Sequence, residues 1–476
     1  MSGERVAKNS VVLIAAEVVK KILGVVTSIL IARALAVDDF GRLRLAMALV
    51  AIFEVLANFG LGPLLTREVA GTPEKGGETF GLVQGIKMIL GLLAAAGMIG
   101  FAVVSGYDGA TLIAVIVAAG IVWFSALEAS AISLLDGYQS MGWSSAIGVV
   151  RSTLVLLAVA VALGRHGALY GVVGAYLFAA VFSAGFGNLL VAGRLRGVSI
   201  RPRLVGAWRQ MRQALPFLLI GVVWMLLFRI DTIMLEALKN EQSVGLYSSG
   251  YVFFELLLVV PILSTRALFP ALTEARATSP ERWRELMGAA LRIYWILALP
   301  IAIGSFFVGA RFVPLLYGAK YAAGGYVVPL LGSYIFLWFG TMTVGWALSA
   351  ADRLGLVLRG NVLAMLVNIA ANFLLIPRFD FFGAAVATII SEAVLLTYFL
   401  IVLRREEGGL PRGIFPWRAL PAAAVLVAAT AALRSFHLAL VIIVGAVLYL
   451  GGIWALGALR DQELEIIRRL VRRKPR

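Results

Sequence analysis

Residues 80–104 read FGLVQGIKMILGLLAAAGMIGFAVV, and Lys87 is the one charged side chain among these twenty-five positions. A helix needs about 20 apolar residues to cross the ~30 Å hydrocarbon core of a bilayer. A helix also satisfies its backbone polar groups within its own segment, as hydrocarbon requires. The stretch is too long and too uniformly apolar for a strand of a membrane barrel. It therefore predicts a transmembrane helix.

Comparable apolar stretches fill most of the remaining chain, which is 61% hydrophobic with a mean hydropathy of +0.94. A soluble domain is nearer half apolar. We therefore expect an all-α polytopic membrane protein with about 14 transmembrane helices. The predicted spans are 9–33, 40–65, 80–104, 109–135, 146–163, 168–191, 214–236, 245–263, 286–308, 326–350, 358–376, 382–403, 416–433 and 437–459.

Basic residues separate by side when the predicted spans alternate across the membrane. The outer loops then carry six, namely Arg165, Lys239, Arg311, Lys320, Arg378 and Arg434. The segment 192–213 alone carries six on the inner side, and the tail 460–476 carries seven. Cytoplasmic loops are the ones enriched in Lys and Arg. We therefore predict a multi-pass protein of the cytoplasmic (inner) membrane with both termini in the cytoplasm.

The net charge of +16 fits this topology without a nucleic-acid partner. Its basic residues lie on short loops beside helix ends, so we expect anionic membrane lipids as their partners. No nucleic-acid-binding module is recognisable, and there is no cysteine for a disulfide or a thiol-based metal site. There is no phosphate-binding loop motif and no HExxH motif. We expect neither an enzyme nor a protein with a resident cofactor.

A parallel internal repeat is indicated by two pairs of short motifs. Phe40-Gly41-Arg42 corresponds to Val244-Gly245-Leu246 at an offset of 204, and Tyr170-Gly171 corresponds to Phe382-Gly383 at an offset of 212. Six predicted helices separate the members of each pair, so both copies have the same orientation. Parallel repeats of this kind place the substrate path between the two halves. Small residues at helix starts are the simpler alternative explanation.

The repeat predicts two six-helix lobes around a central cavity, followed by two extra C-terminal helices. The predicted divisions are an N-lobe at 1–191, a basic cytoplasmic linker at 192–213, a C-lobe at 214–403, helices 13 and 14 within 404–459, and a basic cytoplasmic tail at 460–476.

Charged residues inside the predicted spans suggest a wet cavity, because charge in a membrane is costly and usually faces water or a partner. Glu17, Lys20, Lys21, Gly24 and Ser28 fall mostly on one helical face. Several cations suit an anionic group such as a pyrophosphate. Alternatives are snorkelling at membrane boundaries and an i,i+4 pair of Glu17 with Lys21. The candidate substrate-binding residues are Lys20, Lys21, Lys87, Arg151 and Arg229.

A polar cluster in the second half is a candidate cation site. Asn368 and Asn372 are one turn apart, Thr388 lies on the next predicted helix, and Asp231 lies on the seventh. Oxygen ligands with one carboxylate suit a hard monovalent cation or a proton. The alternative is ordinary hydrogen bonding between membrane helices.

The order of several motifs resembles that of Wzx-like polysaccharide and O-antigen flippases, a family of the multidrug/oligosaccharidyl-lipid/polysaccharide exporter superfamily. The resemblance covers essentially the whole chain. The motifs are Ala32-Arg33-Ala34-Leu35, Asp39-Phe40-Gly41-Arg42-Leu43, Gly60-Leu61-Gly62, Thr66-Arg67-Glu68, Arg229-Ile230-Asp231, Val244-Gly245-Leu246-Tyr247-Ser248, and Leu375-Ile376-Pro377 followed by Phe382-Gly383-Ala384-Ala385.

This resemblance implies a two-lobed alternating-access flippase for a polyprenyl-pyrophosphate-linked oligosaccharide, moved from the cytoplasmic to the outer leaflet for cell-surface polysaccharide assembly. Glycan polymerase or ligase machinery would be its partner. Related lipid II flippases bind sodium through residues that match Asp231, Asn368, Asn372 and Thr388 in order and spacing. Those relatives carry a carboxylate at the position of Asn372, so the resemblance leaves Na⁺ and H⁺ open as the coupling ion.

Two other functions remain as alternatives. A multidrug/cation antiporter of the same superfamily needs an acidic cavity, whereas the bases in these spans outnumber the acids. A membrane-embedded glycan ligase or polymerase needs a sizeable outer loop. The longest outer loop predicted here, at about 309–325, contains no carboxylate.

Overall fold

The computed structural model describes residues 3–165, 169–194, 201–257, 259–407, 409, 413–459 and 463, without the side chains of 3–12, 14, 194 and 259–267. Part of the predicted linker 192–213 and the predicted tail 460–476, except residue 463, lie outside these residues.

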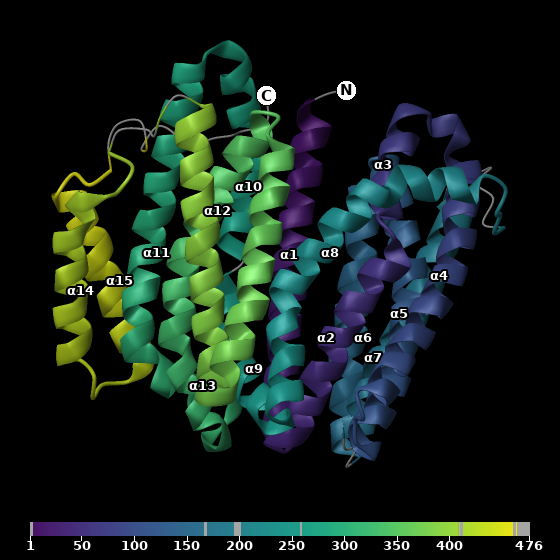
Figure 1. Ribbon diagram of the computed structural model, residues 1–476, viewed down its shortest axis with the longest axis horizontal. Helices are drawn as coiled ribbons and strands as arrows, with labels where there is room; N and C mark the ends of the chain where they lie inside the picture. Colours follow the sequence, from purple (N-terminus) through teal and green to yellow (C-terminus); the bar gives the residue numbers. More distant parts are fainter. Residues whose placement is uncertain are drawn as a thin grey trace. The chain divides into compact units, whose positions relative to one another are not determined.

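Two compact units divide the chain, Met1–Gly245 and Leu246–Arg476 (Figure 1). Helix α9, Glu241–Leu257, begins in the first unit and continues into the second. The other elements of the first unit are α1 Gly3–Ala34, α2 Val37–Asn58, α3 Leu61–Gly71, η1 Pro73–Lys75, α4 Gly76–Val104, α5 Gly109–Gly137, α6 Met141–Gly164, α7 Leu169–Arg194 and α8 Ala207–Leu238. Those of the second unit are α10 Val259–Thr278, α11 Pro280–Tyr317, η2 Ala319–Val327, α12 Val328–Ala350, α13 Leu354–Glu406, η3 Trp417–Ala419, α14 Leu420–Ala432 and α15 Leu438–Ala455.

The predicted all-α membrane architecture is confirmed. Each of the predicted apolar spans overlaps one or two of the helices, with 245–263 divided between α9 and α10, and the described residues form no strand. Nine helices in the described part are long and apolar enough to cross a membrane, or ten if the bent pair α2 and α3 is one span. The protein is a multi-pass membrane protein. Its predicted lobe boundaries stay a prediction.

The second predicted span, 40–65, is not one continuous helix. The chain breaks between α2 and α3, where Phe59 has φ 49° and Gly60 has φ 69°, and the two helices meet at 43°. A Cβ on Gly60 would lie 2.6 Å from both the carbonyl oxygen of Ala214 and the amide nitrogen of Leu218 on α8. The bend therefore depends on a glycine, because it needs a left-handed backbone and leaves no space for a side chain.

Helix α13 is a hairpin of two predicted spans rather than one rod. Asp380 has φ 54° and ψ −139° in the middle of its 53 residues, a conformation that no helix contains. The halves lie side by side, since a Cβ on Gly383 would stand 2.4 Å from the carbonyl oxygen of Leu375. This turn falls between the predicted spans 358–376 and 382–403.

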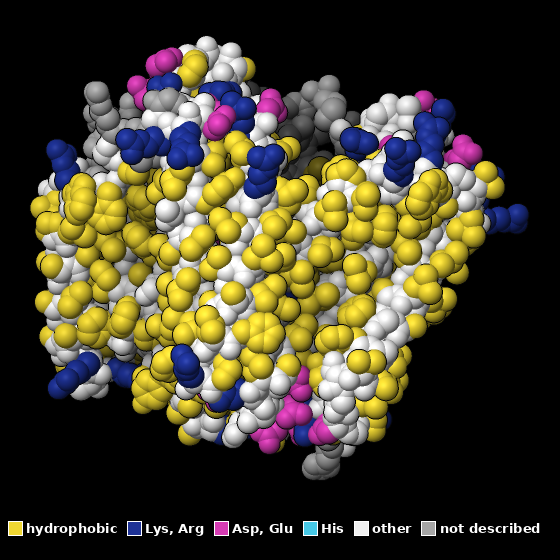
Figure 2. Space-filling view, viewed as in Figure 1, with side chains coloured by type: hydrophobic (Ala, Val, Ile, Leu, Met, Phe, Trp, Pro, Cys, Tyr) yellow, Lys and Arg dark blue, Asp and Glu magenta, His cyan; other side chains and the backbone are white. Residues whose placement is uncertain are grey.

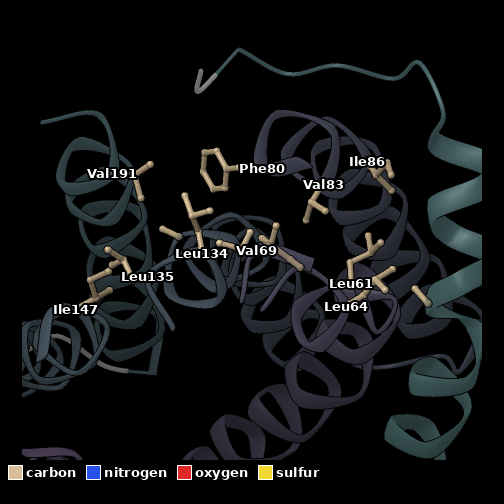
Figure 3. Packing of buried hydrophobic residues seen from close by; sticks show 13 residues of the cluster. Leu61, Leu64, Val69, Phe80, Val83, Ile86, Leu134, Leu135, Ile147 and Val191 are labelled. Atoms are coloured by element: carbon tan, nitrogen blue, oxygen red, sulfur yellow. The ribbon is translucent and has the colours of Figure 1, made fainter. Parts of the chain in front are cut away.

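The core of the first unit gathers around the short helix α3 (Figure 3). Buried side chains from five further helices belong to the same apolar cluster. The members include Leu61, Leu64, Leu65 and Val69 of α3 with Phe80, Val83, Ile86, Ala131, Leu134, Leu135, Ile147, Val191 and Ala214. A helix of 11 residues thereby holds together the long helices that the sequence presents separately.

The described end of the predicted linker crosses α4 at two glycines. Arg203 donates its backbone N–H to the carbonyl oxygen of Gly81 at 2.9 Å, and a Cβ on Gly85 would lie 2.2 Å from the carbonyl oxygen of Arg203. The Gly81-x-x-x-Gly85 spacing thus serves contact with an extended segment, not a second helix. Glu78 adds an exposed ion pair to Arg203 at 3.3 Å.

Helices α14 and α15 form a hairpin that packs on α11. The hydroxyl of Tyr449 donates to the carbonyl oxygen of Ile296 at 2.8 Å, inside a small apolar cluster of its own. Arg311 on α11 donates to the carbonyl oxygens of Arg434 and Phe436 at the tip of the hairpin. The pair is therefore fixed both along its length and at its tip.

The visible surface of each unit is apolar along the helices and charged at their ends (Figure 2). Large side chains such as Leu189, Phe306 and Trp454 are exposed. Apolar exposure on this scale is foreign to soluble monomers, and it is what lipid-facing helices require.

The core around α3 generates a stability prediction. Leu134→Ala should lower the free energy of unfolding by roughly 2–5 kcal/mol, because it leaves a cavity at a fully buried position. Leu157→Ala on α6 is the control, since Leu157 is mostly exposed. Thermal unfolding of the purified protein in detergent measures both. Equal losses in the two variants would contradict the packing described.

Candidate functional site

Lys20 of α1 lies across helix α6. Its Nζ is 2.6 Å from Glu17 Oε1, so the structure pairs Glu17 with Lys20. A Cβ on Gly148 would stand 3.0 Å from Cδ of Lys20 and 3.4 Å from its Nζ. Gly148 therefore provides the space in which this cation rests on α6.

Arg151 of α6 is the centre of a polar network. Its guanidinium donates to Glu128 Oε2 at 2.7 Å and to Ser125 Oγ at 2.8 Å, both on α5. Ser183 of α7 donates to the same Glu128 oxygen at 2.9 Å. The Arg151 side chain is 29% exposed and Glu128 is 4% exposed, so the carboxylate is buried beneath a cation that reaches the surface.

Lys20 and Arg151 lie on one face of α6, because Gly148 and Arg151 are three residues apart. We call this pair the cationic strip. Lys20, Lys21 and Arg229 are also partly exposed. Four of the five predicted substrate-binding residues therefore combine positive charge with access to the surface of the first unit.

Lys87, the fifth predicted residue, is fully buried on α4. Its Nζ donates to Asn58 Oδ1 of α2 at 2.8 Å. One turn earlier, Gln84 donates to Asn188 Oδ1 of α7 at 3.0 Å. In this conformation Lys87 joins α4 to α2 and has no exposed surface for a ligand.

The predicted cation site is represented in the second unit by three residues of α13. Asn372 Nδ2 donates to Asn368 Oδ1 at 2.9 Å, and Asn368 Nδ2 donates to Ser391 Oγ at 3.3 Å. Thr388 Oγ1 donates to the carbonyl oxygen of Ala384 at 3.0 Å. Asn372 Oδ1 is buried and has no hydrogen-bond partner among the described residues. An unsatisfied buried oxygen of this kind is a feature that a cation would satisfy.

Asp231, the fourth predicted ligand, belongs to the first unit. It is buried on α8 and accepts the backbone N–H of Thr232 at 2.8 Å. The described residues contain no group of three or more His, Asp or Glu side chains that could hold a metal ion.

Several functional neighbours were missed from the sequence. Glu128 is an acidic residue inside an apolar span, so the cost of intramembrane charge could have identified it. Ser125, Ser183 and Ser391 carry no such signal, because serine is common on membrane helices. Glu392, which the structure buries against Thr341 Oγ1 of α12, also gains its partner through tertiary packing.

The family model described as polysaccharide biosynthesis protein matches residues 6–276, more than half of the chain. The chain belongs to this family. A curated relative is the probable flippase AglR of Haloferax volcanii. The two chains are 24% identical over 400 residues, which cover 81% of each chain.

The fold of this chain is similar to that of solved transporter structures. A structure of the lipid II flippase MurJ in an inward closed conformation has a TM-score of 0.76 at 13% identity, covering 97% of this chain and all of that one. A multidrug resistance transporter of the MATE family of the MOP superfamily, inward-facing, has a TM-score of 0.68 at 13% identity, covering 84% of this chain and 98% of that one. The chain thus has the fold of the MOP superfamily.

The Arg151 network makes a stability prediction. Arg151→Met should cost roughly 3–5 kcal/mol, because it leaves the Glu128 carboxylate buried without a counter-charge. The double variant Arg151→Met/Glu128→Gln should recover part of this loss, since it removes both charges. Thermal unfolding of the two variants in detergent is the measurement. A double variant no more stable than the single one would show that the ion pair is not what Arg151 contributes.

Proposed function

We propose that this protein is a flippase that moves a polyprenyl-pyrophosphate-linked oligosaccharide from the cytoplasmic to the outer leaflet for the assembly of surface polysaccharide. The cationic strip of the first unit is the observation that carries the proposal. Lys20 and Arg151 present positive charge on one face of α6 at a partly exposed position within apolar helices. A pyrophosphate is the part of such a substrate that needs this environment.

The partial exposure of the strip explains how it can exchange partners. Lys20 is paired with Glu17, and Arg151 is paired with Glu128. Phosphate oxygens accept hydrogen bonds from ammonium and guanidinium groups in the same geometry as carboxylates. The substrate headgroup would therefore replace the exposed Glu17 at Lys20 and add to the accessible side of the Arg151 guanidinium, which keeps its ion pair with the buried Glu128.

The names of similar proteins support the same proposal. AglR is a probable flippase, MurJ is a lipid II flippase, and the matching family is one of polysaccharide biosynthesis. The MATE likeness keeps a multidrug/cation antiporter as the second candidate. The cationic strip argues against it, because like charges repel a cationic drug.

We further propose that an ion gradient resets the transporter. The buried Asn372 Oδ1, on the residue that hydrogen bonds to Asn368, would help bind the coupling ion. Asp231 and Thr388 stay predicted ligands from the sequence, and with one carboxylate among these four residues either Na⁺ or H⁺ is compatible with the chemistry.

A proteoliposome assay tests the transport proposal. It follows a fluorescent polyprenyl-pyrophosphate oligosaccharide from the loaded leaflet, with and without sodium and proton gradients. Gradient-dependent loss of the lipid from that leaflet is the expected result. Export of a cationic dye without movement of the lipid would favour the antiporter.

Removing three exposed positive charges together tests whether the predicted residues bind the substrate. The variant Lys20→Ala/Lys21→Ala/Arg229→Ala should flip the lipid at least about tenfold more slowly, because each lost charge-assisted hydrogen bond is worth roughly 1.5–3 kcal/mol. Lys75→Ala, at an exposed residue of η1, is the matched control and should keep the wild-type rate. Unchanged flipping by the triple variant would overturn the assignment.

The coupling ion can be tested at one residue. Asn372→Asp adds a carboxylate at the unsatisfied oxygen, so the sodium concentration for half-maximal transport should fall about tenfold. Asn361→Asp, at another buried asparagine of α13, is the control and should not shift it. If Asn372→Asp leaves the sodium dependence unchanged, this oxygen does not bind the coupling sodium ion.

A further inference from the structure

The start of helix α8 and the residues just before it expose large apolar side chains. Val205 is 93% exposed, Trp208 is 78% exposed and Leu204 is 52% exposed. Open water would leave all three uncovered, which is costly for groups of this size. Tryptophan exposed near the end of a membrane span is typical of the boundary between hydrocarbon and lipid headgroups. These exposures therefore point to contact with lipid.

One face of the first half of α8 holds the core of the first unit. Gln210 and Ala214, one turn apart, are both buried. Gln210 Nε2 donates to Glu68 Oε2 of α3 at 2.8 Å. The carbonyl oxygen of Ala214 is 2.6 Å from where a Cβ on Gly60 would lie, in the bend between α2 and α3. This face is therefore occupied by α3 and by the bend before it.

The other face of this half of α8 is exposed. It carries a single helical stripe with the spacing i, i+4, i+7, i+11, made of Trp208, Arg212, Leu215 and Leu219. Leucines beside a tryptophan and an arginine form the kind of amphipathic face that lies in the plane of a membrane surface. In Figure 1, α8 begins across the upper end of the first unit before it turns along the other helices. Because the long helices of this unit end there, the stripe lies at the level of a membrane surface.

The positive charge of this segment has no acidic counterpart nearby in the chain. No Asp or Glu occurs between residues 192 and 230, whereas Arg209 and Arg212 are both exposed on α8. Within the described part of the chain, neither of these arginines forms an ion pair or a side-chain hydrogen bond. They are three residues apart and hence neighbours on the helix surface. Two neighbouring guanidinium groups without partners suit phosphate oxygens, which they bind in a bidentate geometry.

We propose that residues 201–219 form a binding site for anionic phospholipid at the predicted cytoplasmic surface of the membrane. The headgroup phosphate contacts Arg209 and Arg212, and Trp208 lies at the depth of the headgroups. Leu215 and Leu219 contact the acyl chains. The site takes lipid of the surrounding membrane, so the proposal stands apart from the proposed flippase function.

Lipid bound at this site acts on the core of the first unit through α8. The part of the helix that exposes Arg209 and Arg212 also contains Gln210 and Ala214, which contact α3 and the bend before it. A ligand that binds the folded chain in preference to the unfolded chain stabilises the folded chain. Anionic lipid should therefore stabilise the packing of α8 on α3.

The first experiment locates the segment in a bilayer. The chain contains no cysteine, so Val205→Cys provides a single thiol for a bimane fluorophore. In vesicles of phosphatidylcholine and phosphatidylglycerol, phospholipids with a spin label high on the acyl chain should quench this fluorophore at least about threefold more than the same fluorophore on Lys75→Cys. Lys75 is an exposed residue of η1, in another predicted cytoplasmic loop. Equal quenching at the two positions, or quenching at Val205→Cys by aqueous iodide alone, would overturn the membrane location.

The second experiment tests the preference for anionic lipid. Spin-labelled phosphatidylglycerol and phosphatidylcholine, with the label on the same carbon, are compared as quenchers of the Val205→Cys fluorophore. Phosphatidylglycerol should be enriched at least about fivefold beside the probe, because each arginine near an anionic headgroup contributes roughly that factor. Adding Arg209→Ala/Arg212→Ala should abolish the enrichment.

The matched control for this variant is Arg404→Ala/Arg405→Ala, which removes two exposed arginines at the end of α13. It should keep the enrichment, because the lost charge lies outside the proposed site. Enrichment that survives Arg209→Ala/Arg212→Ala, or that is absent with both arginines in place, would overturn the proposal.

A third measurement tests the effect on the core. Phosphatidylglycerol added to the purified protein in detergent should raise the temperature of thermal unfolding more than phosphatidylcholine does, for the wild type and for the Arg404→Ala/Arg405→Ala variant. The Arg209→Ala/Arg212→Ala variant should lose this difference between the two lipids. A difference of equal size in all three proteins would overturn the link between this site and the packing of α8 on α3.

Discussion

A charge buried among membrane helices needs a partner on a neighbouring helix, because hydrocarbon offers no water to stabilise it. In the first unit this requirement joins α5, α6 and α7 through Glu128, Arg151 and Ser183, and it joins α4 to α2 through Lys87 and Asn58. Arg151, which we assign to substrate binding, is therefore also part of the scaffold. Its dual role restricts how far it can move without loosening the helices that it connects.

Glycine provides a second kind of connection, in which backbone meets backbone. At Gly60 the backbone of α8 contacts the bend between α2 and α3. At Gly383 the second half of α13 contacts the backbone of the first half. Gly41 and Gly245 contact each other's helices in the same way. In every case a Cβ would collide with main-chain atoms, which cannot rotate away as a side chain can. These contacts set the distances between helices, whereas the apolar side chains fill the space that remains.

The helices were predictable from sequence because a long apolar run leaves the backbone no alternative in lipid. The break at Phe59 and Gly60 was not, because its left-handed geometry depends on α8, more than 150 residues later. The glycines of the repeat were recognised as markers, but their contact required the folded chain. The partner of Arg151 was likewise hidden, since Glu128 lies 23 residues away and nothing in the local pattern joins them. Of the predicted cation site, the sequence identified the asparagines but not Ser391, which binds one of them.

The hairpin of α14 and α15 has a consequence for how the chain can vary. It packs on itself and on α11, through a cluster whose members outside the hairpin region are Ile296, Leu299 and Ile303. Among the described residues, mutations in the hairpin are therefore constrained by one neighbouring long helix, and those in α12 by three, namely α10, α11 and α13. We therefore expect the amino-acid sequence of this hairpin to vary more freely than that of the other helices. Its tip at Arg434–Phe436 is also a suitable place for an insertion, such as a fused reporter domain.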